Sequence, residues 1–325
     1  MIKKHVFFKT AALAFALGIM LTGCQSEKDL ETRLSLRQIA INAEASGDYD
    51  KALEYYDRAL KESSYKVTNL EEDICIKKAE LFYKMGDLES AVNQCNYLIE
   101  FNDNYSDAYY LRGLLYLMQD HTETALTDFA TAIDKCDKDY ETYIAIASAL
   151  ESYGYGDKAS GYLMDALSFK GEGRKDLTFK GRISYILGDY ENAKTLLEAA
   201  IAKDAPEGGD KAKLYLGDTY TALGLDDDAQ EMYSQYVIDA GDDVDVCLSM
   251  GNFAYKKGDY KTALDYYRRG INATDKPKAG LLKGEIAALE QLGKFSEAKK
   301  LMKDYVKAYP DDEAAARENL FLKTR

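Results

Sequence analysis

The stretch Gly258-Asp259-Tyr260-Lys261-Thr262-Ala263-Leu264-Asp265-Tyr266-Tyr267 contains the signals that decide the fold. A glycine followed by a polar residue ends a helix well, because glycine takes the left-handed conformation that closes it. Ala263, Leu264 and Tyr267 then fall at helical spacing on one face of a following segment. The stretch therefore predicts a tight turn between two helices that pack against each other.

The same pattern recurs along most of the chain. An alanine marks each occurrence, at spacings of 39, 34, 34, 34, 36, 34 and 35 residues, in the series Ala52, Ala91, Ala125, Ala159, Ala193, Ala229, Ala263 and Ala298. Five residues before each alanine stands Gly47, Gly86, Asp120, Gly154, Gly188, Gly224, Gly258 or Gly293. Strand-like alternation is absent, so the period predicts a stack of helical pairs.

Paired helices with this period resemble the tetratricopeptide repeat. The family's small residue in the first helix matches Ala40, Ala79, Gly113, Ala147, Gly181, Gly217 and Gly251. Its aromatic residue in the second helix matches Tyr56, Phe129, Tyr233 and Tyr267. The resemblance implies an all-α, right-handed superhelical solenoid of about eight helix-turn-helix repeats, one for each marker.

The markers also predict the domain organisation. The array covers residues 33–312, with repeats that start near residues 33, 72, 106, 140, 174, 210, 244 and 279. A short polar leader precedes it over residues 24–32. Residues 313–325 are expected to form a capping helix, whose last turn presents Leu320, Phe321 and Leu322, because the end of a stacked array needs a cover.

Residues 1–23 are predicted to be a lipoprotein signal peptide. Three lysines precede an apolar run from Ala11 to Leu21, which is too short to span a bilayer. The run ends in Leu21-Thr22-Gly23-Cys24, which resembles the bacterial lipobox. That resemblance implies cleavage before Cys24 and attachment of acyl chains such as palmitate, which anchor the chain to a membrane. An ordinary secretory signal with a chance cysteine is the alternative.

The charge of the chain limits its partners. Its formal net charge is −14, and loss of a signal with three lysines and no acids lowers it to −17. An acidic surface repels phosphate backbones, so no nucleic-acid partner is expected. The same charge suits a protein that stays soluble beside a membrane, or one that binds a basic partner.

Few residues are available for metal binding or catalysis. Beyond Cys24 the cysteines are Cys75, Cys95, Cys136 and Cys247, and their spacing matches no paired-cysteine metal motif. His121 is the one histidine outside the signal. We therefore expect no metal, no cofactor and no enzymatic activity. The cysteines suit inert core thiols, although a disulfide between Cys75 and Cys95 is an alternative in an oxidising compartment.

The family resemblance also suggests a binding surface. In tetratricopeptide repeats the first helix of each pair lines a groove, and the matching positions here include Tyr110, Leu114, Leu117, Ile144, Arg182 and Tyr185. Large apolar residues on a groove suit a protein or peptide partner, and packing between neighbouring repeats is the alternative. The family's Lys, Asn and Arg cluster for a terminal carboxylate is absent, since its positions hold Arg37, Ile41, Lys77, Asp107 and Leu111.

These observations together predict a binding protein. We expect a bacterial scaffold or adaptor, lipid-anchored on the extracytoplasmic face of a cell membrane or outer membrane. Its groove would bind a protein or peptide partner, with assembly of an envelope complex as a possible task. A receptor for a small peptide or glycan ligand is the second hypothesis, because the chain has 27 tyrosines that can stack on a ligand.

Overall fold

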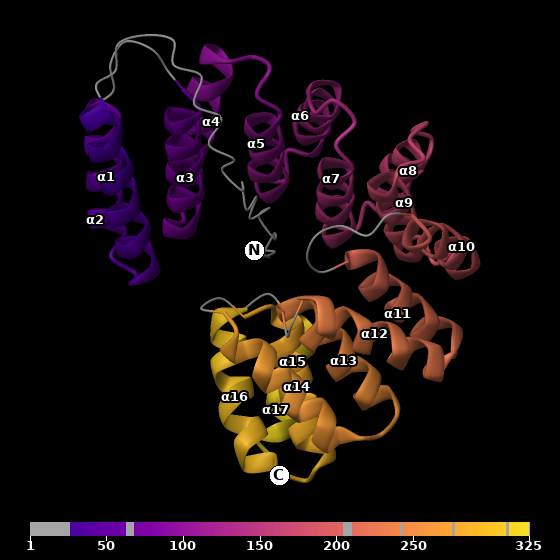
Figure 1. Ribbon diagram of the computed structural model, residues 1–325. Helices are drawn as coiled ribbons and strands as arrows, with labels where there is room; N and C mark the ends of the chain where they lie inside the picture. The colour runs from indigo at the N-terminus through magenta and orange to yellow at the C-terminus, as the bar shows by residue number, and fades with distance from the viewer. Residues whose placement is uncertain are drawn as a thin grey trace. The chain divides into compact units, whose positions relative to one another are not determined.

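The computed structural model describes residues 27–62, 68–203, 210–240, 243–274, 277–309 and 312–324. Within these ranges the chain forms seventeen α-helices and no strand, as the repeat pattern predicts (Figure 1). None of these helices is long and apolar enough to cross a membrane. The predicted signal peptide and Cys24 lie outside the described residues.

The helices form eight successive pairs, and one further helix ends the chain. The first four pairs are α1 (Glu27–Ala45) with α2 (Tyr49–Lys61), α3 (Asn69–Met85) with α4 (Leu88–Phe101), α5 (Ser106–Met118) with α6 (Thr122–Lys135), and α7 (Tyr140–Ser152) with α8 (Gly156–Leu167). The last four are α9 (Arg174–Ile186) with α10 (Tyr190–Ile201), α11 (Lys211–Leu223) with α12 (Asp226–Ala240), α13 (Val244–Lys256) with α14 (Tyr260–Asn272), and α15 (Ala279–Gln291) with α16 (Phe295–Ala308). The single helix that follows is α17 (Glu313–Leu322).

The start of α1 differs from the prediction. The polar leader was expected to reach residue 32, whereas α1 begins at Glu27. Leu30, Glu31 and Arg33 are good helix formers, so the helix can extend through this polar stretch. Polarity alone therefore does not distinguish a leader from the exposed first turns of a helix.

Two compact units divide the chain. The N-terminal unit holds the described residues up to Ala159, and the C-terminal unit begins at Ser160. Within the C-terminal unit each helix from α9 to α17 packs against the next one along the chain, and the first helices α9, α11, α13 and α15 also contact one another in order. In the N-terminal unit α1 to α7 follow the same sequential packing. Contacts between successive helices therefore build each unit, from α1 to α7 in one and from α9 to α17 in the other.

Left-handed residues close the first helix of every pair. The seven glycines at Gly47, Gly86, Gly154, Gly188, Gly224, Gly258 and Gly293 have φ between 71° and 81°, and Asp120 takes the same conformation with φ of 60°. An aspartate one residue after the glycine then caps the second helix in several pairs; the Asp259 carboxylate, for example, accepts from the Thr262 backbone N–H at 3.1 Å. The predicted turn chemistry is confirmed.

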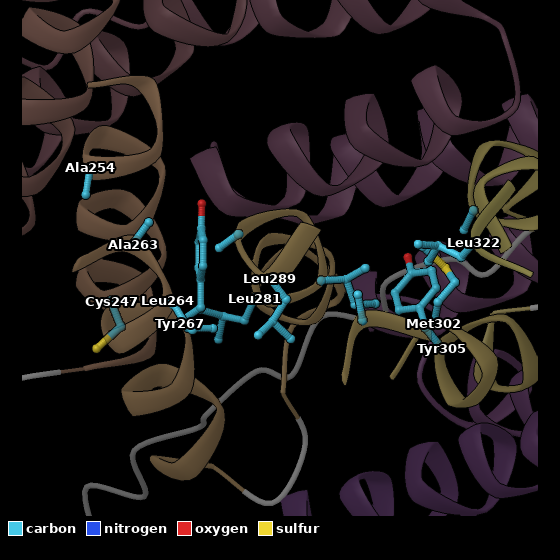
Figure 2. Packing of buried hydrophobic residues seen from close by; sticks show 14 residues of the cluster. Cys247, Ala254, Ala263, Leu264, Tyr267, Leu281, Leu289, Met302, Tyr305 and Leu322 are labelled. Carbon is cyan, nitrogen blue, oxygen red and sulfur yellow. The ribbon is translucent and has the colours of Figure 1, made fainter. Parts of the chain in front are cut away.

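Small first-helix residues allow a close approach by second-helix aromatic rings. A Cβ atom added at Gly251 would lie 2.5 Å from Cε1 of Tyr267, and one at Gly217 would lie 2.5 Å from Cε1 of Tyr233. The Tyr267 ring also meets Gly284 of the following first helix, so it is held between α13 and α15. Figure 2 shows this ring between the helix that carries Ala254 and the one that carries Leu281 and Leu289.

The last helix packs on the end of the stack through two buried side chains, Ala315 and Leu322. Leu322 is buried in the same cluster as Met302 and Tyr305 of α16 (Figure 2). Its neighbours Leu320 and Phe321 are 63% and 50% exposed. Successive helical residues point about 100° apart, so one of the three can face α16 while the others turn outward. The helix α17 thus lies where the sequence predicts a capping helix, and of the three apolar residues in its last turn Leu322 is the one that is buried.

We expect Gly251→Ala to lower the free energy of unfolding of the C-terminal unit by about 1–3 kcal/mol, because the new methyl group overlaps the buried Tyr267 ring. Gly161→Ala is the matched control, since Gly161 lies inside α8 with no atom within 4 Å of the added Cβ. It should stabilise by up to about 1 kcal/mol through helix propensity. Thermal unfolding followed by far-UV circular dichroism measures both, and equal effects would contradict the packing account.

Candidate functional site

Four of the six predicted groove residues are buried. Tyr110, Leu114, Leu117 and Ile144 expose between 0% and 6% of their surface in the full chain. The Tyr110 ring lies 6.2 Å from the ring of Phe129 on its partner helix α6, so it packs inside its own pair. In this structure the four side chains are therefore packed and not exposed on a groove wall, and their role in binding a partner stays a prediction. The position of a residue in the repeat predicts which turn of the first helix it occupies, but it does not predict whether neighbouring helices bury the side chain.

The other two predicted residues, Arg182 and Tyr185, lie half-buried on α9 in the C-terminal unit. The Arg182 guanidinium sits 5.3 Å from the centroid of the Tyr215 ring on α11. Within the described ranges Arg182 makes no ion pair, unlike Arg174 and Arg268, which pair with carboxylates. A guanidinium held on an aromatic face keeps its N–H donors available for a carboxylate.

Opposite charges bridge the next three first helices. Lys211 of α11 donates to Asp245 Oδ2 of α13 at 2.9 Å, and Lys278, the residue before α15, donates to Asp245 Oδ1. Burial alone would raise the pKa of Asp245, but the hydrogen bonds and charges of Lys278 and Lys211 outweigh it and lower that pKa to about 2. Asp245 is therefore ionised at any physiological pH, and it fixes both lysines on this surface.

A second carboxyl group on α11 behaves in the opposite way. The Tyr233 hydroxyl of α12 donates to Asp218 Oδ1 at 2.8 Å. Burial raises the pKa of Asp218 to about 6, although hydrogen bonds from Tyr233 and Ser249 oppose the shift. Asp218 consequently changes its charge close to neutral pH. Asp245, on the same surface, stays ionised at that pH.

We call the surface formed by Arg182, Tyr185, Lys211, Tyr215, Asp245 and Lys278 the first-helix face. Its side chains come from α9, α11, α13 and the residue before α15, and these first helices contact one another in order. Three cations stand against Asp245 and, above its pKa of about 6, Asp218, so the local charge is about +1 at neutral pH in a chain of net charge −14. Such a surface attracts an acidic segment and offers aromatic rings for stacking.

The sequence reasoning missed Lys211, Tyr215, Asp245 and Lys278. A signal for three of them is present, because Lys211 and Asp245 are 34 residues apart and Asp245 and Lys278 are 33 apart. Alternating charges at one repeat spacing occupy equivalent positions on neighbouring first helices, where they can pair. Tyr215 has no such signal.

The four described cysteines are all free thiols. The disulfide that the sequence allowed between Cys75 and Cys95 is therefore not formed in this structure. Burial raises the pKa of the Cys95 thiol to about 12, which keeps it protonated and unreactive. Among the described residues, no group of three or more histidine, cysteine, aspartate or glutamate side chains is arranged to hold a metal ion.

Family models described as tetratricopeptide repeat match residues 35–71, 181–245, 244–276 and 284–312. These segments fall on the first pair of the N-terminal unit and on the pairs that build the first-helix face. The chain belongs to the tetratricopeptide repeat family. Proteins of this family are generally scaffolds that bind protein or peptide partners.

Curated relatives match parts of the chain. A TPR repeat-containing protein of Methanocaldococcus jannaschii is 27% identical over 182 residues, which cover 51% of this chain and 30% of that protein. RNA polymerase II-associated protein 3 of Xenopus laevis is 27% identical over 106 residues, which cover 33% of this chain and 15% of that protein. The chain thus spans less than a third of the length of these two relatives.

A solved structure shares the fold. The tetratricopeptide repeat protein from Parabacteroides merdae superposes with a TM-score of 0.50 at 12% sequence identity, over 80% of this chain and 99% of that one. At this identity the similarity concerns the fold, an all-α tetratricopeptide repeat solenoid, and nothing about its partner.

We expect Asp218→Asn to stabilise this tetratricopeptide repeat protein at pH 7.5 by about 1 kcal/mol. The folded-state pKa of Asp218 is raised from 3.8 to about 6, so the folded chain binds the proton more tightly than the unfolded chain does. Its stability contribution is therefore full below about pH 4 and is lost as the pH rises through about 6. Asparagine keeps an oxygen for Tyr233 and carries no charge, so the difference between variant and wild type should vanish near pH 4.

Asp245→Asn is the comparison variant, and its effect on the free energy of unfolding should have the opposite sign. The pKa of Asp245 is lowered from 3.8 to about 2, so its contribution is present above about pH 4 and is lost on acidification toward pH 2. This variant should be less stable than wild type at pH 7.5, by about 1 kcal/mol or less because the side chain is partly exposed. Urea unfolding at pH 4 and pH 7.5 checks both, and a stability gain for both variants would contradict the assigned environments.

Proposed function

We propose that the chain is a lipid-anchored scaffold that binds a protein or peptide partner on its first-helix face. The anchor would place it on the extracytoplasmic side of a bacterial cell membrane or outer membrane, where it would serve the assembly of an envelope complex. The observation that carries the binding proposal is the Arg182 guanidinium on the Tyr215 ring, which makes no ion pair in the described ranges, on a face that also carries Lys211 and Lys278.

The chemistry of the face favours an extended, acidic partner segment. A segment that crosses α9, α11 and α13 meets Arg182, then Tyr215, then Lys211 with Asp245. The fork of guanidinium donors suits a carboxylate in bidentate geometry, and the ring of Tyr215 already fixes its plane. Since Asp245 pre-orders the lysines before any partner arrives, less side-chain entropy is lost on binding.

The membrane part of the proposal rests on the sequence around Cys24. Only Gln25 and Ser26 separate that cysteine from Glu27, the first residue of α1. Two extended residues span roughly 7 Å, so acyl chains on Cys24 would hold the first helical pair directly at the bilayer surface. Two or more acyl chains give stable anchoring where a single chain does not.

A receptor for a small peptide or glycan is the alternative. Tyrosine rings meet where a first helix turns into its second helix: Tyr185 and Tyr190 lie 5.5 Å apart, and Tyr255 and Tyr260 lie 5.2 Å apart. Such paired rings can stack on a sugar or on an aromatic side chain. The partner search described next separates the two hypotheses, because a receptor for a small ligand needs no protein partner.

The binding proposal is tested by crosslinking and co-purification from native membranes. We expect wild type to recover a partner that an Arg182→Ala, Tyr215→Ala double variant loses by about tenfold, because both halves of the cation–ring contact are removed. Lys303→Ala, an exposed change on α16, is the matched control and should recover the partner fully. Both variants must first show wild-type circular dichroism.

The possible outcomes of this search differ clearly. If the double variant recovers the same partner as wild type, the first-helix face is not the binding surface. If wild type recovers no protein at all, the scaffold proposal fails and the receptor hypothesis is favoured. Variants at Tyr110 or Leu114 would not serve here, because truncation of a buried side chain lowers stability by about 2–5 kcal/mol whatever it binds.

The anchor is tested with Cys24→Ser. We expect wild-type protein expressed in a bacterial host to sediment with membranes and to carry acyl chains detectable by intact mass spectrometry. The Cys24→Ser variant should leave the membrane fraction and lack the added mass, because serine supplies no thiol for acylation. Cys136→Ser is the control for loss of a thiol elsewhere, and a wild-type chain without added mass would refute lipidation.

A further inference from the structure

A cavity of about 300 Å³ lies between α12, α13 and α14 of the C-terminal unit. We call it the interhelix pocket, and its principal lining residues are Asp226, Asp227, Met250, Phe253, Asp259 and Tyr266. At 100° per residue, Met250 and Phe253 point roughly 80–140° around α13 from Asp245. The pocket is therefore a separate surface from the first-helix face, although α13 contributes to both.

The floor of the interhelix pocket is apolar and aromatic. Phe253 and Met250 are partly buried and pack against the cluster that contains Tyr233. The rings of Tyr233 and Phe253 meet edge to face at 5.9 Å, which fixes the plane of Phe253. A flat apolar surface of this kind suits the aliphatic stem of a long side chain, and the cavity is large enough to admit one.

The rim of the pocket is acidic. Asp226, Asp227 and Asp259 stand against one cation, Lys257, whose ammonium pairs with Asp226 at 2.6 Å. Hydrogen bonds from Thr262 lower the pKa of Asp259, so this carboxylate stays ionised at neutral pH. Asp227 is exposed and makes no hydrogen bond or ion pair within the part of the chain that the structure describes. The rim thus keeps a net charge of about −2.

Two of these acids also serve their helices. Asp259 caps α14, and Asp226 begins α12, where the helix dipole offsets part of its charge. Asp227 is left as the carboxylate with no partner in the described ranges, and it projects beside the apolar floor. Tyr266 at the pocket wall already holds the Arg269 guanidinium at 4.9 Å from its ring centroid, which shows that this ring accepts a planar cation.

We propose that the interhelix pocket binds an arginine side chain from an extended, basic segment of a protein partner. The stem of that arginine lies over Phe253 and Met250, and its guanidinium reaches Asp227. Arginine fits better than lysine, because its planar fork both stacks on an aromatic ring and pairs with a carboxylate in bidentate geometry. This site depends neither on the first-helix face nor on the lipid anchor.

The test uses methyl NMR on the whole protein labelled with ¹³C-methyl methionine. Met250 reports on the pocket floor, and Met250→Leu assigns its signal. The probe is N-acetyl-L-arginine amide, and N-acetyl-L-citrulline amide is the neutral probe of nearly the same shape. We expect the arginine probe to shift the Met250 signal saturably in the millimolar range, as suits a single side chain, and the citrulline probe to leave it in place.

Two neighbouring substitutions distinguish binding of the arginine probe in the pocket from nonspecific electrostatic attraction to the acidic surface. Asp227→Asn should weaken binding of the arginine probe by about threefold or more. Asp228→Asn makes the same change of charge one residue along the same exposed turn, outside the pocket lining, and should leave the affinity unchanged. The proposal is overturned if the arginine probe does not shift Met250, if citrulline shifts it equally, if Asp227→Asn has no effect, or if Asp228→Asn weakens binding as much.

Discussion

The packing of this fold rests on the contact where the two helices of a pair cross, as in the pairs whose first helix carries Gly113, Gly181, Gly217 or Gly251. At this crossing a first-helix residue with little or no side chain meets a bulky second-helix side chain, as Gly251 meets Tyr267 and Gly217 meets Tyr233. A glycine inside a helix costs about 0.5–1 kcal/mol relative to alanine, so its use here indicates that the close approach is worth more. The buried aromatic ring then sets the distance between the helices, and in the case of Tyr267 it also touches Gly284 of the next pair. The packing of this one ring thereby determines both the distance between the two helices of its pair and the stacking of that pair on the next one.

The same aromatic rings link the core to the surface. Tyr233 packs its ring on Gly217 and bonds its hydroxyl to Asp218, and Tyr267 packs on Gly251 and bonds to Asn252 at 2.9 Å. In each case the polar acceptor directly follows the small residue on the first helix, so the ring that enters the crossing carries its hydroxyl to the next position. The Asp218 and Asn252 side chains of the first helices are therefore held in place by hydrogen bonds from buried tyrosines. Because these anchors are part of the core, a partner meets a surface that is already ordered, which reduces the entropy lost on binding.

The sequence predicts local chemistry here better than it predicts exposure. The turn positions could be identified because a left-handed residue is required there, and Asp120 takes that conformation where the glycine is missing. The burial of Leu114 and Ile144 could not be identified, since helical periodicity places a residue on a turn and leaves open what covers it. The pairing of Lys211, Asp245 and Lys278 required the register of neighbouring first helices, which the repeat length contains but which composition does not reveal. The interhelix pocket had no sequence signal, because its walls come from three helices that meet only in the fold.

The two surfaces of the C-terminal unit discriminate by charge. At neutral pH the first-helix face carries about +1, with Asp218 included, and the interhelix pocket about −2, by the formal charges of their residues. An acidic segment is therefore attracted to one surface and repelled by the other, and a basic segment behaves in reverse. Repulsion of the wrong segment adds as much to selectivity as attraction of the right one. A partner that carries both kinds of segment would bind its second site at a high effective concentration once the first is bound, so two weak contacts would hold it firmly and in one orientation.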